Sequence, residues 1–239
     1  MKILCIGNSF SSDATRYLQS VGGGQLYVRN LFIGGCSLET HYNNIVENNE
    51  FYDYQIDDAY VRKASIEASL LENDWDVVTI QQVSHFSGME ETYEPYMTKI
   101  IEFIKKKCPK AEIVFHRTWA YDDKSEHGGF ANYGRDRKTM YNAIVSTTDK
   151  MAKKHGLRII PCGDAIEAAR DLPEFTQGAS LNLNRDGFHL SLDYGRYLAA
   201  LTWYGFFTKN SPLDVSYEPD NTDPAINKKL KEIAHRITC

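Results

Sequence analysis

Short apolar runs alternate along the chain with longer amphipathic stretches. The short runs predict strands at residues 3–6, 26–33, 75–80, 111–115 and 157–160. The longer stretches predict helices at residues 13–21, 63–71, 96–107, 136–154, 164–170, 194–207 and 224–237. Strands that alternate with helices indicate an α/β fold, here a three-layer α/β/α sandwich around a mainly parallel sheet of about five strands. No linker interrupts the pattern, so we expect one domain over residues 1–239.

Two stretches have no clear period. Residues 41–60 are rich in Asn, Asp and Tyr, and we interpret them as a loop-rich excursion. Residues 122–134 form a polar, glycine-rich segment that could act as a lid.

Composition and charge exclude several classes of function. A hydrophobic fraction of 42% supports a sizeable core. A net charge of -5 without a basic cluster argues against nucleic acid or an anionic membrane as partner. No apolar run reaches transmembrane length and no signal peptide is recognisable, so the sequence as it stands suggests a cytoplasmic protein. A periplasmic or secreted protein without its export signal would look the same, and the oligomeric state is not indicated.

The five cysteines are scattered, at Cys5, Cys36, Cys108, Cys162 and Cys239. They form no CxxC pair and no Cys/His ligand spacing, which argues against a zinc site, and their odd number argues against a disulfide framework. We therefore expect no metal and no cofactor.

The first predicted strand runs directly into Gly7-Asn8-Ser9. The carboxyl ends of parallel strands share one edge of an open sheet, and ligands bind at that edge. Ser9 is therefore placed where a nucleophile or an anion-binding hydroxyl is useful. The alternative is a serine that only caps the first helix.

Asp186 and His189 stand three residues apart, just before the helix predicted at 194–207. A carboxylate beside an imidazole fixes the tautomer of the ring and stabilises the imidazolium. A capping aspartate next to an ordinary histidine would give the same pattern.

Taken together, these motifs resemble those of the SGNH (GDSL-like) hydrolase superfamily. Gly7-Asn8-Ser9 matches its first block, Gly-Asp-Ser, with Asn in place of Asp. Gly35, after the second predicted strand, matches the glycine of the second block, and Asp186 with His189 matches the fifth. The resemblance implies a flavodoxin-like sandwich in which Ser9 is the nucleophile, His189 the base and Asp186 its orienting partner. The backbone N–H groups of Ser9 and Gly35 would hold the oxyanion.

The third block departs from the family pattern. Where Gly-x-Asn-Asp is usual, this chain has Gln82-Val-Ser-His85. His85 falls closest to the family's asparagine by register, but Gln82 carries the same amide donor. We favour Gln82 as the third oxyanion donor.

The expected substrate is a small-molecule or glycan ester, from which the enzyme would remove an acetyl or another small acyl group. Aromatic faces suit sugar rings, so His116, Trp119 and Tyr121 could line a sugar-binding wall, although core aromatics would give the same pattern. Asn8 and His85 are weaker candidates for substrate contact, and Asn8 is better explained as a turn former.

Three other functions fit parts of the sequence. A lipase- or thioesterase-like hydrolase would need a long apolar channel. A non-catalytic flavodoxin-like module would cradle a phosphate with residues 7–12 but would leave Asp186 and His189 without a task. A glycan-binding module would bind sugar without turnover. His127, in the glycine-rich segment, is expected to be solvent-exposed.

Overall fold

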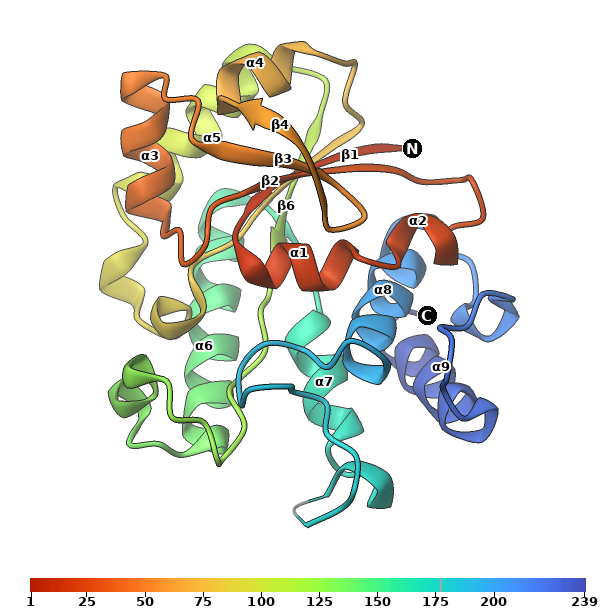
Figure 1. Cartoon of the computed structure of the whole chain (residues 1–239). Helices are drawn as coiled ribbons and strands as arrows, with labels where there is room; N and C mark the ends of the chain where they lie inside the picture. Colours follow the sequence, from red (N-terminus) through yellow and green to blue (C-terminus); the bar gives the residue numbers. More distant parts are fainter. Residues whose placement is uncertain (177) are drawn as a thin grey trace.

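Apolar side chains alternate between the two faces of the inner strands, so the sheet is covered on both sides. On the first strand, Ile3 and Cys5 enter one core while Leu4 and Ile6 enter the other. The computed structural model describes residues 1–176 and 178–239, and within them the chain forms a seven-stranded sheet between two layers of helices (Figure 1). The predicted α/β sandwich is therefore confirmed, with two more strands than expected.

The strands and helices follow one another in a βα pattern. The strands are β1 (Lys2–Gly7), β2 (Tyr27–Phe32), β3 (Tyr52–Ile56), β4 (Ala59–Ala64), β5 (Val77–Ile80), β6 (Glu112–His116) and β7 (Arg158–Ile160). The α-helices are α1 (Ser9–Thr15), α2 (Leu18–Val21), α3 (Leu38–Glu47), α4 (Ile66–Leu71), α5 (Tyr96–Lys107), α6 (Arg137–His155), α7 (Cys162–Ala169), α8 (Tyr194–Thr208) and α9 (Pro224–Thr238). Short 3-10 helices include Ser84–Phe86, Glu90–Thr92 and Gly128–Tyr133.

The two helical layers bury separate cores. Helices α1, α2, α7, α8 and α9 cover one face of the sheet, and α3, α4 and α5 cover the other (Figure 1). Helix α6 contributes to both cores, through Met140 and Ile144 on one side and Met151 on the other. Helix α8 is apolar around most of its circumference because the sheet, α1, α7 and α9 enclose it. Within the described residues, no helix is both long and apolar enough to cross a membrane.

Residues 41–60 are more regular than the sequence suggests. Helix α3 occupies the first part, capped by Ser37, whose hydroxyl accepts a hydrogen bond from the Thr40 N–H. Strands β3 and β4 form an antiparallel hairpin, so the helix predicted from residue 63 begins only at Ile66. The hairpin extends the parallel part of the sheet, and the sheet order is β4-β3-β2-β1-β5-β6-β7.

The parallel strands β2, β1, β5, β6 and β7 end at nearly the same level. Ile6 of β1 is paired with Ile80 of β5, which is paired with Phe115 of β6. The loops that follow these strands therefore meet along one edge, and that edge carries the residues singled out from the sequence.

Candidate active site

Ser9 is the first residue of α1, directly after β1. The preceding Asn8 has an extended backbone, and its side-chain oxygen accepts a hydrogen bond from the Phe10 N–H at 3.0 Å, so the helix begins earlier than predicted. Ser9 is half-buried at the edge of the sheet. Because the first N–H groups of a helix have no partner within it, the Ser9 N–H is available to a ligand.

Asn8 joins three of the loops at this edge. Its Oδ1 accepts a hydrogen bond from Gln81 Nε2 (2.8 Å), and its Nδ2 donates to the Cys36 carbonyl (3.0 Å). The residue is 1% exposed. These contacts confirm the interpretation of Asn8 as a turn former.

Gly35 lies in the loop after β2 that Asn8 holds through Cys36. Its φ of +64° is in the left-handed region, which glycine adopts without strain. Gly35 is exposed, and within the described part of the chain its N–H donates no hydrogen bond. The loop thus presents an unpaired N–H beside the start of α1.

Asp186 and His189 form a direct pair. Asp186 Oδ2 lies 2.6 Å from His189 Nδ1, and Asp186 Oδ1 accepts hydrogen bonds from the backbone N–H groups of His189 (2.8 Å) and Phe188 (3.1 Å). Burial alone would raise the pKa of Asp186, but these hydrogen bonds outweigh it and hold the pKa below its usual value. The carboxylate therefore stays charged and keeps the proton of the ring on Nδ1, which leaves Nε2 as the basic nitrogen.

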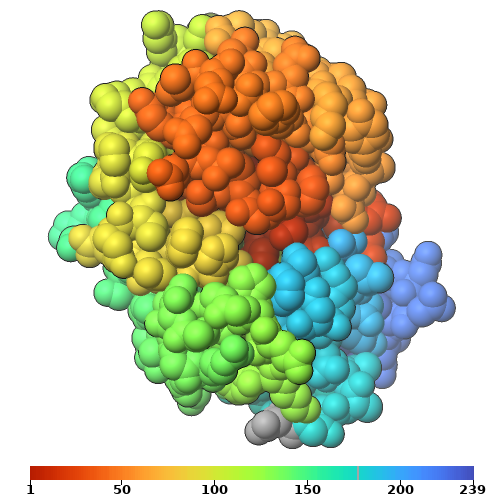
Figure 2. All heavy atoms as spheres, turned by 60° about the vertical axis from the view of Figure 1, so that its left-hand side comes forward, coloured from red at the N-terminus to blue at the C-terminus, as the bar shows by residue number. Residues whose placement is uncertain are grey.

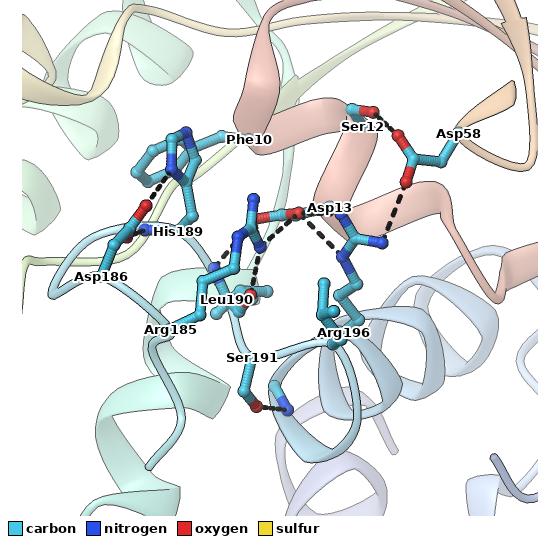
Figure 3. Close-up of polar contacts among 12 residues, drawn as sticks. Phe10, Ser12, Asp13, Asp58, Arg185, Asp186, His189, Leu190, Ser191 and Arg196 are labelled. Carbon is cyan, nitrogen blue, oxygen red and sulfur yellow. Dashed lines mark hydrogen bonds and ion pairs between the residues drawn. The ribbon is translucent and has the colours of Figure 1, made fainter. Parts of the chain in front are cut away.

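The loop that carries this pair packs against the helix of Ser9. The rings of Phe10 and His189 are 6.0 Å apart between centroids, and the Leu190 N–H donates to Asp13 Oδ2 at 2.8 Å (Figure 3). Residues separated by about 180 positions thus meet at one place. Within the described residues the Ser9 hydroxyl and the His189 ring share no hydrogen bond, and in unliganded enzymes such bonds often tighten only when substrate binds.

The site opens into a hollow on the molecular surface. In Figure 2, dark red atoms of the N-terminal segment lie at the bottom of a depression. It is bordered by the orange segment of residues 30–50, the yellow segment near residue 85, the green segment near residue 125 and the blue segment near residue 190. The hollow therefore collects the loops that follow β1, β2, β5 and β6.

The Gln82 amide, expected to donate to the oxyanion, is bound within the protein instead. Its Nε2 donates both hydrogens to Thr92, at 3.0 Å to the carbonyl and 3.1 Å to the hydroxyl. Its Oε1 accepts from the N–H groups of Leu38 (3.0 Å) and Val83 (2.8 Å). With these bonds in place the amide has no hydrogen left for an oxyanion, and it instead anchors the start of α3 behind the Gly35 loop.

The expected aromatic wall is part of the core. His116, Trp119 and Tyr121 are each at most 1% exposed, so their side chains are closed off from the surface. Burial lowers the pKa of His116 to about 3, which keeps its ring neutral. The Trp119 indole N–H donates to the Phe188 carbonyl at 2.7 Å, beside His189. These rings pack beneath the loops of the site, because the segment after β6 that carries them turns into the core.

Two other histidines lie beside the catalytic candidates. His127 is half-buried where we expected an exposed side chain, and its ring lies 4.9 Å from that of Phe188 and 5.5 Å from that of His85. Burial lowers the pKa of His127, and the nearby charge of His189 lowers it further. Burial also lowers the pKa of His85. Both rings are therefore neutral hydrogen-bonding groups at the rim of the site near pH 7.

Sequence reasoning missed Asp13 and Arg185, which connect the helix of Ser9 to the loop of His189 (Figure 3). The only signal was the spacing of four residues between Ser9 and Asp13, which places both on one side of a helix. Within residues 1–176 and 178–239, no group of three or more His, Cys, Asp or Glu side chains is arranged to hold a metal ion.

A family model described as "Domain of unknown function (DUF4886)" matches residues 2–237. The chain belongs to the DUF4886 family. A crystal structure of a DUF4886 protein from Bacteroides uniformis has a TM-score of 0.91 to it at 36% identity, covering 99% of this chain and 93% of that one. A comparison with curated proteins found no match.

Solved structures outside the family share the fold of this DUF4886 protein. A proposed SGNH hydrolase from Slackia heliotrinireducens has a TM-score of 0.60 at 22% identity and covers 85% of this chain and 97% of its own. An acetyl xylan esterase has a TM-score of 0.57 at 15% identity, with coverages of 86% and 98%. The fold of this DUF4886 protein is thus that of the SGNH/GDSL-like hydrolases.

Proposed function

We propose that this DUF4886 protein is a serine-dependent ester hydrolase that transfers an acyl group to water. The observation that carries the proposal is the Asp186–His189 pair, which is docked on the helix that begins at Ser9. A nucleophile, a base and a group that orients the base are the parts such a reaction needs. The flavodoxin-like binding module is less favoured because it gives this pair no task.

In the proposed reaction the Ser9 Oγ attacks the ester carbonyl carbon while His189 Nε2 takes the hydroxyl proton. Asp186 holds the Nδ1 proton and stabilises the imidazolium. The N–H groups of Ser9 and Gly35 stabilise the oxyanion. The tetrahedral intermediate collapses, and the departing alcohol takes the proton from His189. Water then attacks the acyl-serine with His189 as base, which releases the acid and restores Ser9.

As substrate we propose an ester of acetate or another small acid with a carbohydrate. The acetyl xylan esterase with this fold supports the reaction type, and the open hollow suits a sugar better than a long alkyl chain. The half-exposed His85 and half-buried His127 offer ring nitrogens to sugar hydroxyls. The buried Trp119 does not take part.

The decisive experiment compares the wild type with Ser9→Ala and Ser37→Ala. Ser37 is a matched control because it caps a helix at this edge of the sheet, but among residues 1–176 and 178–239 its hydroxyl is hydrogen-bonded to Thr40 and to no imidazole. We expect Ser9→Ala to lose hydrolysis of p-nitrophenyl acetate and labelling by a fluorophosphonate, followed as intact mass, and Ser37→Ala to keep both. Equal rates and labelling in all three proteins would exclude Ser9 as the nucleophile.

The acyl group and the alcohol are tested separately. We expect rates to fall from acetyl to octanoyl p-nitrophenyl esters, and acetate to be released from an acetylated xylo-oligosaccharide. A preference for the octanoyl ester would favour the lipase- or thioesterase-like alternative. Binding of the oligosaccharide without acetate release would favour a glycan-binding module.

A further inference from the structure

Asp13 is a buried carboxylate at the junction between the helix of Ser9 and the loop of His189. Its side chain is 1% exposed. It accepts hydrogen bonds from the Leu190 N–H (2.8 Å), Arg185 Nη1 (3.0 Å) and Arg196 Nε (2.8 Å), as Figure 3 shows. The proposed chemistry uses none of these groups, so the arrangement needs its own explanation.

Two of these bonds hold the backbone beside His189. The Leu190 N–H donates to Asp13, and Arg185, which is bound to the same carboxylate, donates to the Leu190 carbonyl. At the other end of the turn, the Arg185 N–H donates to the His189 carbonyl at 3.0 Å. The peptide groups on both sides of Leu190 are therefore tied to Asp13, directly or through Arg185. We call Asp13, Arg185 and Leu190 the Asp13 clamp.

The position of Asp13 connects the clamp to the nucleophile. Residues four apart lie on one side of a helix, so Asp13 and Ser9 face in similar directions from α1. One end of this rigid segment carries the hydroxyl, and the other fixes the loop with the imidazole. Asp13 therefore lies on the structural connection between the Ser9 hydroxyl and the loop of His189.

The outer part of the network balances charge. Arg196 also binds Asp58 Oδ2 at 2.9 Å, and Asp58 Oδ1 accepts from the Ser12 hydroxyl at 2.8 Å. Two arginines thus neutralise two carboxylates between α1, α8 and the β3–β4 turn. Asp13 and Arg196 are the buried members of this network. Taking charges out of water is unfavourable, and well-packed apolar residues often stabilise a fold equally well. Stability alone therefore explains the buried Asp13–Arg196 pair poorly.

We propose that Asp13 is a positioning residue of the hydrolase, which sets the distance between the Ser9 hydroxyl and the His189 imidazole through the clamp. The inference rests on the proposed function, because it assigns a task to that site. A shift of about 1 Å in a catalytic group can cost about 100-fold in rate. Substrate binding depends less on this distance, so the effect belongs in kcat rather than KM.

The test compares Asp13→Asn and Arg185→Gln with the control Asp58→Asn. The control removes a charge from the same network without touching the His189 loop. Asn at position 13 keeps the shape but loses one acceptor oxygen and the charge. Arg185 has a side chain that is 32% exposed, so its variant remains informative if Asp13→Asn does not fold. Hydrolysis of p-nitrophenyl acetate gives kcat and KM, and hydrogen exchange at the Leu190 amide reports docking without substrate.

We expect kcat to fall at least ten-fold in Asp13→Asn and Arg185→Gln, with KM within two-fold and faster exchange at Leu190. Asp58→Asn should keep kcat within two-fold. Wild-type kcat in both clamp variants would overturn the inference while leaving the proposed function intact. The inference would also be overturned if kcat fell in all three variants only in proportion to the fraction of folded protein. If Ser9→Ala keeps the activity, the proposed function fails, and unchanged exchange at Leu190 would then overturn the clamp independently.

Discussion

Replacement of Asp186 by Asn tests the tautomer of His189 with little change of shape. In the wild type one carboxylate oxygen faces the ring Nδ1 and the other accepts two backbone N–H groups, from Phe188 and His189. An amide has one acceptor and one donor end. If its oxygen faces the two N–H groups, its NH2 faces the ring. The opposite orientation pairs the oxygen with the ring but sets the NH2 against two donors.

The first orientation wins because it keeps two hydrogen bonds instead of one, each contributing about 0.5–1.5 kcal/mol. The NH2 then forces Nδ1 to act as acceptor, which moves the ring proton to Nε2, the atom that should receive the proton of Ser9. In a protease triad a wrong tautomer costs about 10⁴-fold in kcat. Here the Asp186 side chain is 40% exposed, so water screens the electrostatic part. We expect a loss of about 100- to 1,000-fold, or about 2.7–4.1 kcal/mol at 1.36 kcal/mol per decade.

The assay is steady-state hydrolysis of p-nitrophenyl acetate together with the rate of fluorophosphonate labelling. Asp193→Asn is the matched control, because Asp193 caps the N-terminus of α8 in the same segment and, within the described residues, forms no hydrogen bond with an imidazole. Asp186→Asn added to Ser9→Ala should cause no further loss, since residues that act as a unit are not additive. A kcat of Asp186→Asn within three-fold of the wild type, with His189→Ala inactive, would refute the tautomer argument.

Three further changes probe the site and the stability of the fold. Gly35→Ala puts an L-residue at a φ of +64°, where it is strained although the added Cβ meets no atom. The strain should displace the Gly35 N–H and lower kcat about 10- to 100-fold. Gly35→Asn should lose less activity in the same assay, because Asn tolerates this φ. Trp119→Phe removes the N–H donated to the Phe188 carbonyl and should lower the free energy of unfolding by about 1–3 kcal/mol in urea titrations. Burial alone would raise the pKa of Glu94, but hydrogen bonds, that from Lys154 first, lower it to about 2 from the usual 4.5. The ionised Glu94 therefore stabilises the fold fully above about pH 4.5 and loses this contribution as the pH falls through about 2, so Glu94→Gln should lower the urea midpoint at pH 7 and lower it clearly less at pH 2.5.

The parts of the fold that rest on local chemistry could be predicted from the sequence. The apolar runs gave all five parallel strands because each is bounded by polar residues or glycine. The β3–β4 hairpin was not predicted, because its turn residues, Asp57 and Asp58, both have positive φ and no glycine marks the turn in the sequence. Strand β4 is exposed along most of its length, so it has no apolar alternation either.

The side-chain orientations in the site could not be predicted, because they depend on partners far along the chain or in irregular turns. Gln82 carries an amide like that of the asparagine in the SGNH pattern. Thr92, ten residues later in a short turn, offers two acceptors and binds both amide hydrogens. Trp119 was a candidate for a sugar-binding wall because aromatic faces suit sugar rings. In the structure its face is covered by Phe10, whose ring centroid lies 4.2 Å away.

The Asn at position 8, where the SGNH pattern has Asp, is explained by its contacts. An Asp at position 8 could not donate to the Cys36 carbonyl, and at 1% exposure it would place a carboxylate against that oxygen, whereas the amide of Asn8 donates there and accepts from Gln81. Gln81 can supply that donor because its own oxygen lies 2.7 Å from Nδ1 of the neutral His116. A chain of uncharged donors and acceptors thus runs from the end of β6 through β5 to the turn before Ser9. Asn8 in the first block and Gln81, directly before the third, are therefore coupled: the Gln81 amide donates to Asn8, and Asn8 in turn holds the loop of Gly35 through the Cys36 carbonyl without a buried charge.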